Sequence, residues 1–193
     1  MTRHDGRSPD QLRELDLQPD FLEQPHGSVL YAQGRTVVLC TATIDEDIPR
    51  WLRGKGKGWM TAEYSLLPAS TGERTQRAVT RGRPDGRTVE IQRLIGRALR
   101  SVCDFQALGE RTLWLDCDVL QADGGTRCAA ITGAYVAAFR ALDRFGLTKA
   151  LPSSVAAVSV GVVNGEPVLD LATGGIEELR TAQRTACEAA SII

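Results

Sequence analysis

The sequence has few of the residues that build metal centres and disulfide frameworks. It contains two histidines, His4 and His26, and five cysteines, none of which forms a Cys-x-x-Cys pair. Structural zinc sites need closely spaced cysteines and histidines, so the sequence excludes zinc, and the odd cysteine count argues against a disulfide framework. No apolar run reaches the length of a membrane span, and the N-terminus has no apolar signal core. These absences predict a cytoplasmic protein with no membrane contact.

The residues that are present are typical of a soluble globular protein. Hydrophobic residues make up 42% of the 193 residues, charged residues make up 24%, and the formal net charge is −1. This length can bury a proper core. We therefore expect a single domain over residues 1–193, in which residues 1–26 form an irregular polar arm.

The charge is distributed unevenly along the chain. The segment from residue 74 to residue 100 carries eight arginines against two acids, Asp85 and Glu90. A second cationic run precedes Trp59 and consists of Arg50, Arg53, Lys55 and Lys57. A basic stripe on a neutral chain favours a polyanionic partner, although a solvated helix face would carry the same residues. The stretch 74–87 is too polar to pack, and we predict that it contacts RNA.

The segment Gln121-Ala-Asp-Gly-Gly-Thr-Arg127 lies between a strand-like and a helix-like run. Gly124 and Gly125 allow backbone N–H groups to approach a ligand, and the helix adds the positive end of its dipole. Thr126 offers a hydroxyl and Arg127 a planar set of donors. A second helix start, at Arg87, follows Asp85-Gly86. The two loops predict one phosphate site; for the first loop alone, an ordinary strand-to-helix turn is the alternative.

Hydrophobic periodicity predicts an α+β fold. The expected strands and helices alternate as β-β-β-α-β-α-β-β-α, which indicates a mixed sheet with helices packed on one side. Residues 68–86 are polar and without periodicity, as in a functional or mobile loop. The expected strands are residues 28–33, 36–44, 59–67, 112–120, 154–163 and 168–171, and the expected helices are residues 88–102, 128–145 and about 176–190.

Six passages together resemble bacterial ribonuclease PH. They are Gly27-Ser-Val-Leu30, Val38-Leu-Cys-Thr-Ala42, Gly58-Trp-Met-Thr-Ala-Glu-Tyr64, Gly86-Arg-Thr-Val-Glu-Ile-Gln-Arg-Leu-Ile95, residues 115–127 and Ala156-Ala-Val-Ser-Val-Gly-Val-Val-Asn-Gly165. The resemblance implies a phosphate-dependent exoribonuclease that trims tRNA 3′ ends, releases nucleoside diphosphates and forms hexameric rings as trimers of dimers.

The resemblance also implies roles for individual residues. Inorganic phosphate, the co-substrate, would be held by Arg87, Gly125, Thr126 and Arg127. The loop that carries Arg74 and Arg77 would contact the tRNA. Ala69 stands where the family usually has a basic residue, which implies that RNA binding is either weaker or redistributed over other residues.

The resemblance breaks after Leu171. Family members continue into an acidic segment with two catalytic aspartates that bind Mg²⁺, whereas here a passage like the family's C-terminal helix follows at once. Glu177 and Glu178 are more typical of acids in a first helical turn. Asp116 and Asp118 share a strand face and could bind Mg²⁺, although pairing with an arginine is the favoured interpretation. The sequence thus predicts an exoribonuclease with severely weakened activity, or else an inert ring-forming or RNA-binding subunit. A small-molecule kinase is disfavoured because no ATP loop is present.

Overall fold

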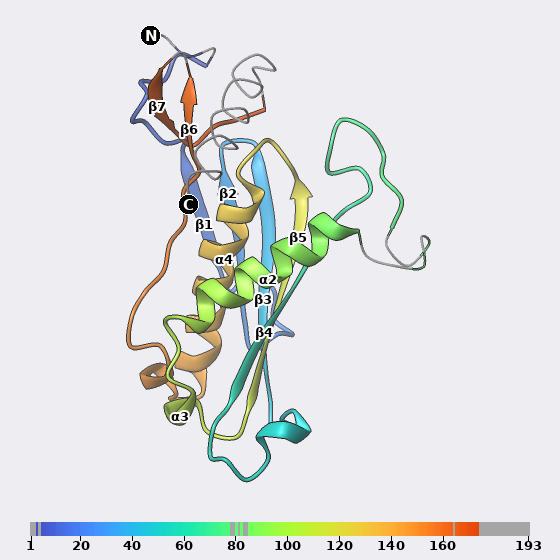
Figure 1. Ribbon diagram of the computed structural model, residues 1–193, viewed down its shortest axis with the longest axis vertical. Coiled ribbons are helices and arrows are strands. Elements are labelled where there is room, and N and C mark those ends of the chain that lie inside the picture. Colours follow the sequence, from blue (N-terminus) through green and yellow to red (C-terminus); the bar gives the residue numbers. More distant parts are fainter. Residues whose placement is uncertain are drawn as a thin grey trace.

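The computed structural model describes residues 3, 5–77, 80, 82, 85–163 and 165–173. A five-stranded sheet forms its centre, with the order β1-β2-β3-β5-β4 (Figure 1). Neighbouring strands are antiparallel except for β4, which runs parallel to β5. The strands are β1 (Leu15–Pro19), β2 (Gly27–Gln33), β3 (Thr36–Asp45), β4 (Trp59–Leu66), β5 (Thr112–Gln121) and a separate pair, β6 (Val160–Val163) and β7 (Glu166–Leu169).

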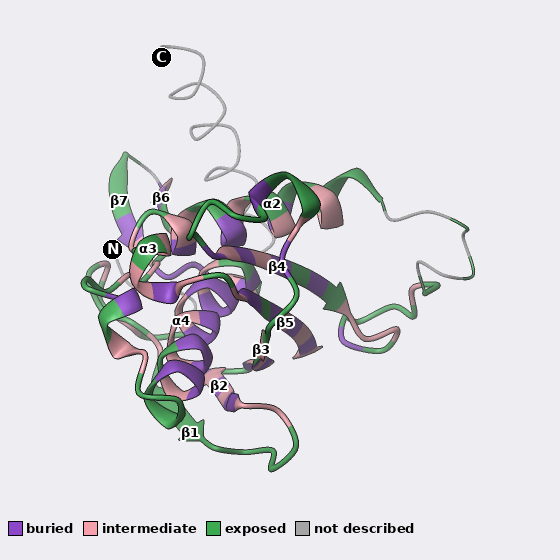
Figure 2. Cartoon of the chain, turned by 90° about the horizontal axis from the view of Figure 1, so that it is seen from below, coloured by how far each residue is buried: buried purple, intermediate pink, exposed green. Residues whose placement is uncertain are grey.

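Alternating side chains give the central sheet one buried face. In β5, Leu113, Leu115, Cys117 and Val119 are buried, whereas the residues between them point to the other face. The same alternation runs through β3 and β4 (Figure 2). The expected mixed sheet with one buried face is therefore confirmed.

The two long helices, α2 (Gly86–Arg100) and α4 (Thr126–Arg144), cover the buried face (Figure 1). α2 buries Ile91, Ile95 and Leu99 against β4. α4 packs so closely on β2 that a Cβ atom at Gly27 would lie 2.2 Å from the carbonyl oxygen of Ala137. The short elements η1 (Arg50–Leu52), α3 (Phe105–Leu108) and η2 (Thr148–Ala150) lie in the connections. The helices lie on one side of the sheet, as the sequence predicts.

Two expectations about secondary structure need correction. The N-terminal arm is not wholly irregular, because β1 pairs with β2 as the edge strand of the sheet. The strand expected over residues 154–163 spans only Val160–Val163. In the preceding segment the Ala157 N–H donates to the Thr132 hydroxyl of α4 at 3.1 Å, so this part of the chain is tied to a helix. The helix expected near residues 176–190 lies outside the described residues. Within the described ranges, no helix combines the length and apolar character that a membrane crossing requires.

Candidate phosphate and RNA site

The two glycine–arginine loops leave the sheet at the same end, where β4 and β5 have their C-terminal residues. Because β4 and β5 are parallel, the loops that follow them leave from neighbouring positions. The loop after β5 leads into α4, with Gly125 as its N-cap and Thr126 as its first residue. Gly124 and Gly125 have φ values of +79° and +71°, and a Cβ atom at Gly124 would lie 2.6 Å from the carbonyl oxygen of Leu171. Glycine is required here by conformation and by space.

Tyr64 connects β4 to the start of α4. Its hydroxyl group shares a buried hydrogen bond of 2.9 Å with the hydroxyl of Thr126. Burial raises the pKa of Tyr64, while the bond to Thr126 and the charges of Arg87 and Arg127 oppose that rise. Both guanidinium groups are therefore near enough to Tyr64 to act on it electrostatically. Thr126 therefore contacts Tyr64 directly, Gly125 precedes it as the N-cap of α4, and Arg87 and Arg127 lie within electrostatic reach of the same tyrosine.

Arg127 already has an anionic partner. Its Nη2 atom donates to Oε2 of Glu90, one turn along α2 from Arg87, at 2.6 Å. Both side chains are about half exposed, so this pair contributes at most about 1 kcal/mol to stability. Arg87 is exposed. The first-turn N–H groups of α4, which has no side-chain cap, lie beside these cations and favour an anion.

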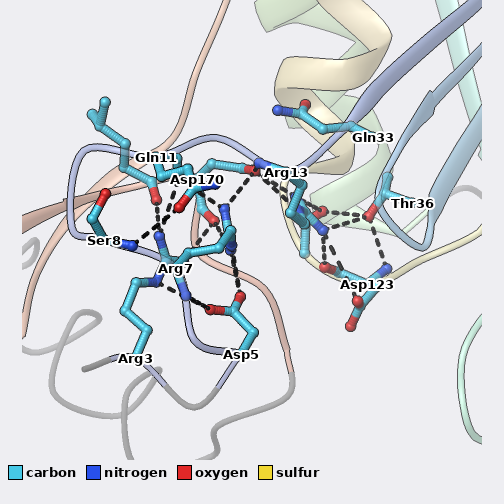
Figure 3. Close-up of polar contacts among 12 residues, drawn as sticks. Arg3, Asp5, Arg7, Ser8, Gln11, Arg13, Gln33, Thr36, Asp123 and Asp170 are labelled. Atoms are coloured by element: carbon cyan, nitrogen blue, oxygen red, sulfur yellow. Dashed lines mark hydrogen bonds and ion pairs between the residues drawn. The ribbon is translucent and has the colours of Figure 1, made fainter.

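Arg13, which pairs with Asp170, fixes the backbone of the glycine loop (Figure 3). Arg13 donates from Nη1 to the carbonyl oxygen of Asp123 at 2.7 Å and from Nη2 to that of Gly124 at 3.3 Å. The same side chain donates to both carboxylate oxygens of Asp170, at 2.9 and 2.6 Å. Thr36 also donates to the Gly124 carbonyl at 2.7 Å. The loop is therefore fixed by a buried ion pair between residues 157 positions apart.

Asp170 is the centre of a larger ionic network. Burial alone would raise its pKa, but the hydrogen bonds of Arg13 and the charges of Arg13 and Arg7 outweigh burial and lower the pKa. Arg3 and Arg7 donate to its backbone carbonyl, both at 3.0 Å. Sequence reasoning missed this network, and the only local signal was a group of arginines in the first 13 residues.

The predicted RNA-contacting residues lie beside this edge. Arg74 and Arg77 are exposed, and neither forms an ion pair with another described residue. A cleft of about 280 Å³ separates the segment around Arg77 from β4 and the start of α2, with Tyr64 and Gln92 in its wall. Arg77 thus lies beside the candidate phosphate site.

The acids proposed as substitute metal ligands lie elsewhere. Asp116 and Asp118 point to the sheet face opposite the helices, away from the buried side where Tyr64 meets Thr126. Burial raises the pKa of Asp116, and the charges of Glu63 and Asp118 add to this effect. Burial also raises the pKa of Asp118, while Arg77 opposes it without forming an ion pair. The described residues contain no cluster of three potential metal ligands. Glu177 and Glu178 lie outside these residues.

Comparison with known proteins agrees with this architecture. The family model described as "3′ exoribonuclease family, domain 1" matches residues 11–141. The ribonuclease PH of Syntrophomonas wolfei is 56% identical over 176 residues, which cover 89% of this chain and 74% of the relative. The ribonuclease PH of Frankia casuarinae is 52% identical over 190 residues, which cover 98% and 77% respectively. The chain thus spans about three quarters of the length of these relatives.

Solved structures show the same fold. Rice (Oryza sativa) Rrp46 has a TM-score of 0.74 at 25% identity, with 93% of this chain and 77% of that chain covered. The Archaeoglobus fulgidus exosome with RNA bound to the active site has a TM-score of 0.72 at 22% identity, with 93% and 73% covered. At 22% identity, the similarity to the Archaeoglobus fulgidus exosome is evidence for the fold alone.

A mixed sheet covered on one side by two helices, with a glycine loop at the start of α4, defines the architecture, and the sequence relatives define the family. The chain belongs to the 3′ exoribonuclease family. Ribonuclease PH proteins, its curated relatives, are phosphate-dependent nucleotidyltransferases that shorten RNA from the 3′ end. The comparisons favour this enzymatic function over an inert ring-forming or RNA-binding subunit.

Proposed function

We propose that this chain trims tRNA 3′ ends by phosphorolysis, with inorganic phosphate held by Arg87, Gly125, Thr126 and Arg127. The observation that carries this proposal is the arrangement around Tyr64. The hydroxyl of Thr126 is fixed by Tyr64, and the charges of Arg87 and Arg127 both act on the same tyrosine. In this arrangement, one phosphate ion would be bound by two cations, one hydroxyl group and the N-terminus of a 19-residue helix.

The chemistry follows from this placement. An oxygen of the bound phosphate attacks the phosphorus of the terminal phosphodiester, and the bond from that phosphorus to the preceding 3′-oxygen breaks. The terminal nucleotide leaves as a nucleoside diphosphate, and the released 3′-oxygen takes up a proton. Arg87 and Arg127 offset the charge that accumulates on the two phosphoryl groups. Positioning and charge neutralisation carry most of the acceleration in such transfers.

The same proposal extends to the RNA and to the assembly. Exposed Arg74 and Arg77 would contact the phosphates of the tRNA near its 3′ end. We also propose a hexameric ring, a trimer of dimers, on the basis of the family relationship and the fold shared with an archaeal exosome core. A cytoplasmic location, where free thiols such as Cys40 persist, fits this role.

Magnesium is implied by the family, but the described residues do not fit it at this site. Asp116 and Asp118 lie on the open face of the sheet, and burial with like charge favours the protonated form of Asp116. No cluster of three ligands occurs in the part of the chain that the structure describes. We therefore assign no residue to magnesium.

A product assay tests the proposed function. A tRNA precursor labelled at its 3′ end is incubated with the protein, with and without inorganic phosphate. We expect phosphate-dependent release of nucleoside diphosphates. Arg127→Ala should slow this release by about a hundredfold or more, whereas Arg93→Ala, which changes an exposed arginine elsewhere on α2, should leave it intact. Release of nucleoside monophosphates without phosphate would indicate hydrolysis and contradict the proposal. RNA binding without any product would support the inert subunit.

A further inference from the structure

All three tryptophans of the chain gather at one end of the sheet. Trp51 in η1 packs edge-on against Trp59, with ring centroids 5.1 Å apart, and Trp59 stacks on Phe105 at 6.0 Å. Trp114 of β5 and Trp59 line the same cleft, which has a volume of about 410 Å³. Trp51 is 56% exposed and Trp114 is 41% exposed. Clustered exposed aromatic side chains mark an interaction surface more often than a core.

Basic side chains lie in the cleft and in the loop that follows Trp51. Arg50 and Arg53 line the cleft, and Lys55 and Lys57 follow in the exposed loop that leads into β4. Arg53 is paired with Asp47 at 2.9 Å, whereas Arg50 and both lysines form no ion pair with a described residue. Asp45 and Asp47 also line the cleft, and Glu110 accepts from the Gly56 N–H at 3.0 Å, so the unpaired cations of this surface are Arg50, Lys55 and Lys57 among the described residues.

The tryptophans lie at the opposite end of β4 from the candidate phosphate site. β4 begins at Trp59 and ends at Leu66, next to the loop that leads to Arg87. An eight-residue strand spans about 25 Å. In Figure 1 η1, coloured cyan, lies at the end of the molecule remote from the start of α4. An RNA whose 3′ end occupies the phosphate site would therefore reach this surface only with nucleotides further upstream.

We propose that Trp51, Trp114, Arg50, Lys55 and Lys57 form a second RNA-binding surface that takes single-stranded RNA upstream of the 3′ end. Bases stack on the exposed indole rings, and the cations contact the backbone phosphates. Aromatic side chains interleaved with basic ones are the usual means of binding single strands without regard to sequence. The proposal rests on the proposed function for the identity of the ligand, but it concerns residues outside the phosphate site.

Equilibrium binding without phosphate tests this surface, because no turnover then occurs. Two unstructured RNAs are compared, one long enough to span the strand and one too short. We expect Trp51→Ala with Trp114→Ala to weaken binding of the long RNA by roughly thirtyfold or more, as for the loss of two stacked bases, and to leave the short RNA unchanged. Phe139→Ala, which removes another exposed aromatic ring, is the matched control.

A charge variant supplies an independent readout. Lys55→Gln with Lys57→Gln should flatten the salt dependence of binding for the long RNA only. Unchanged binding of the long RNA in both variants would overturn the proposal, as would equal losses for both RNAs. A change in oligomeric state in the tryptophan variant would assign the surface to a second copy of the chain, also against the proposal. Arg127→Ala, which tests the proposed function, changes a residue at the other end of β4. Either proposal can therefore be contradicted without the other.

Discussion

The hydroxyl groups of Tyr64 and Thr126 lie 2.9 Å apart, and their buried hydrogen bond joins β4 to the first turn of α4. It orients the Thr126 hydroxyl at the start of α4, the helix that also carries Arg127. The charges of Arg87 and Arg127 both act on the same tyrosine.

Tyr64→Phe removes this link without changing the packing of the ring. We expect a loss of about 1 kcal/mol in the free energy of unfolding, which is typical for one hydrogen bond. The Michaelis constant for phosphate should rise, because Thr126 loses its fixed orientation, while the constant for RNA should stay the same. Phosphate titrations at saturating RNA measure this difference. Equal changes in both constants would mean that Tyr64 acts only through stability.

Glu90→Gln removes the carboxylate that holds Arg127. The pair is exposed, so the melting temperature should hardly change. Phosphate should bind more tightly, because a negative charge beside the anion site is lost. Calorimetric titration with phosphate measures the affinity, and Glu73→Gln, an exposed acid outside the site, is the control. Weaker phosphate binding would show that Glu90 orients Arg127 and does not compete for it.

Asp170→Asn keeps the shape of the side chain, and asparagine tolerates the positive φ of 51° at this position. It leaves the buried Arg13 with only the more distant Asp123, at 4.0 Å, as a countercharge, so we expect a loss of about 3 kcal/mol at neutral pH. The folded-state pKa of Asp170 is lowered, so its contribution is present above the ordinary value of 3.8 and is lost as pH falls through the lower folded value. Denaturant unfolding across acidic pH should show the two proteins converging. A constant difference at all pH values would contradict this origin.

Asp116→Asn should raise the stability of the protein at neutral pH, whereas Asp170→Asn should lower it. The folded-state pKa of Asp116 is raised by burial and by Glu63 and Asp118, so the wild type loses stability as pH rises through that value. The variant avoids this loss and should be more stable at neutral pH, with the difference vanishing in acid. Thermal melts at several pH values test it. Phosphorolysis should be unchanged, and a loss of turnover would identify Asp116 as a replacement metal ligand.

Much of the fold could be predicted because its elements carry local patterns. The alternation in β5 and the apolar stripe of α2 decide which side chains face the core. β1 lacked such a signal, because all five of its residues are exposed and it is held by backbone pairing with β2. Arg87 and Arg127 could be predicted as phosphate ligands because glycines precede both of them at helix starts. The ion pair of Arg13 and Asp170 could not be predicted, because it depends on contact between the two ends of the described chain.

The account rests on a phosphate site formed by Arg87, Gly125, Thr126 and Arg127. Calorimetric titration with inorganic phosphate tests it most directly, with wild type, Arg87→Ala, Arg127→Ala and the control Arg93→Ala. We predict one phosphate site in the wild type and the control, and loss of binding in both site variants. The specificity constant for phosphorolysis should fall in parallel, by about a hundredfold to a thousandfold for each arginine, as when one preorganised donor is removed. Unchanged phosphate affinity in Arg87→Ala and Arg127→Ala would contradict the account.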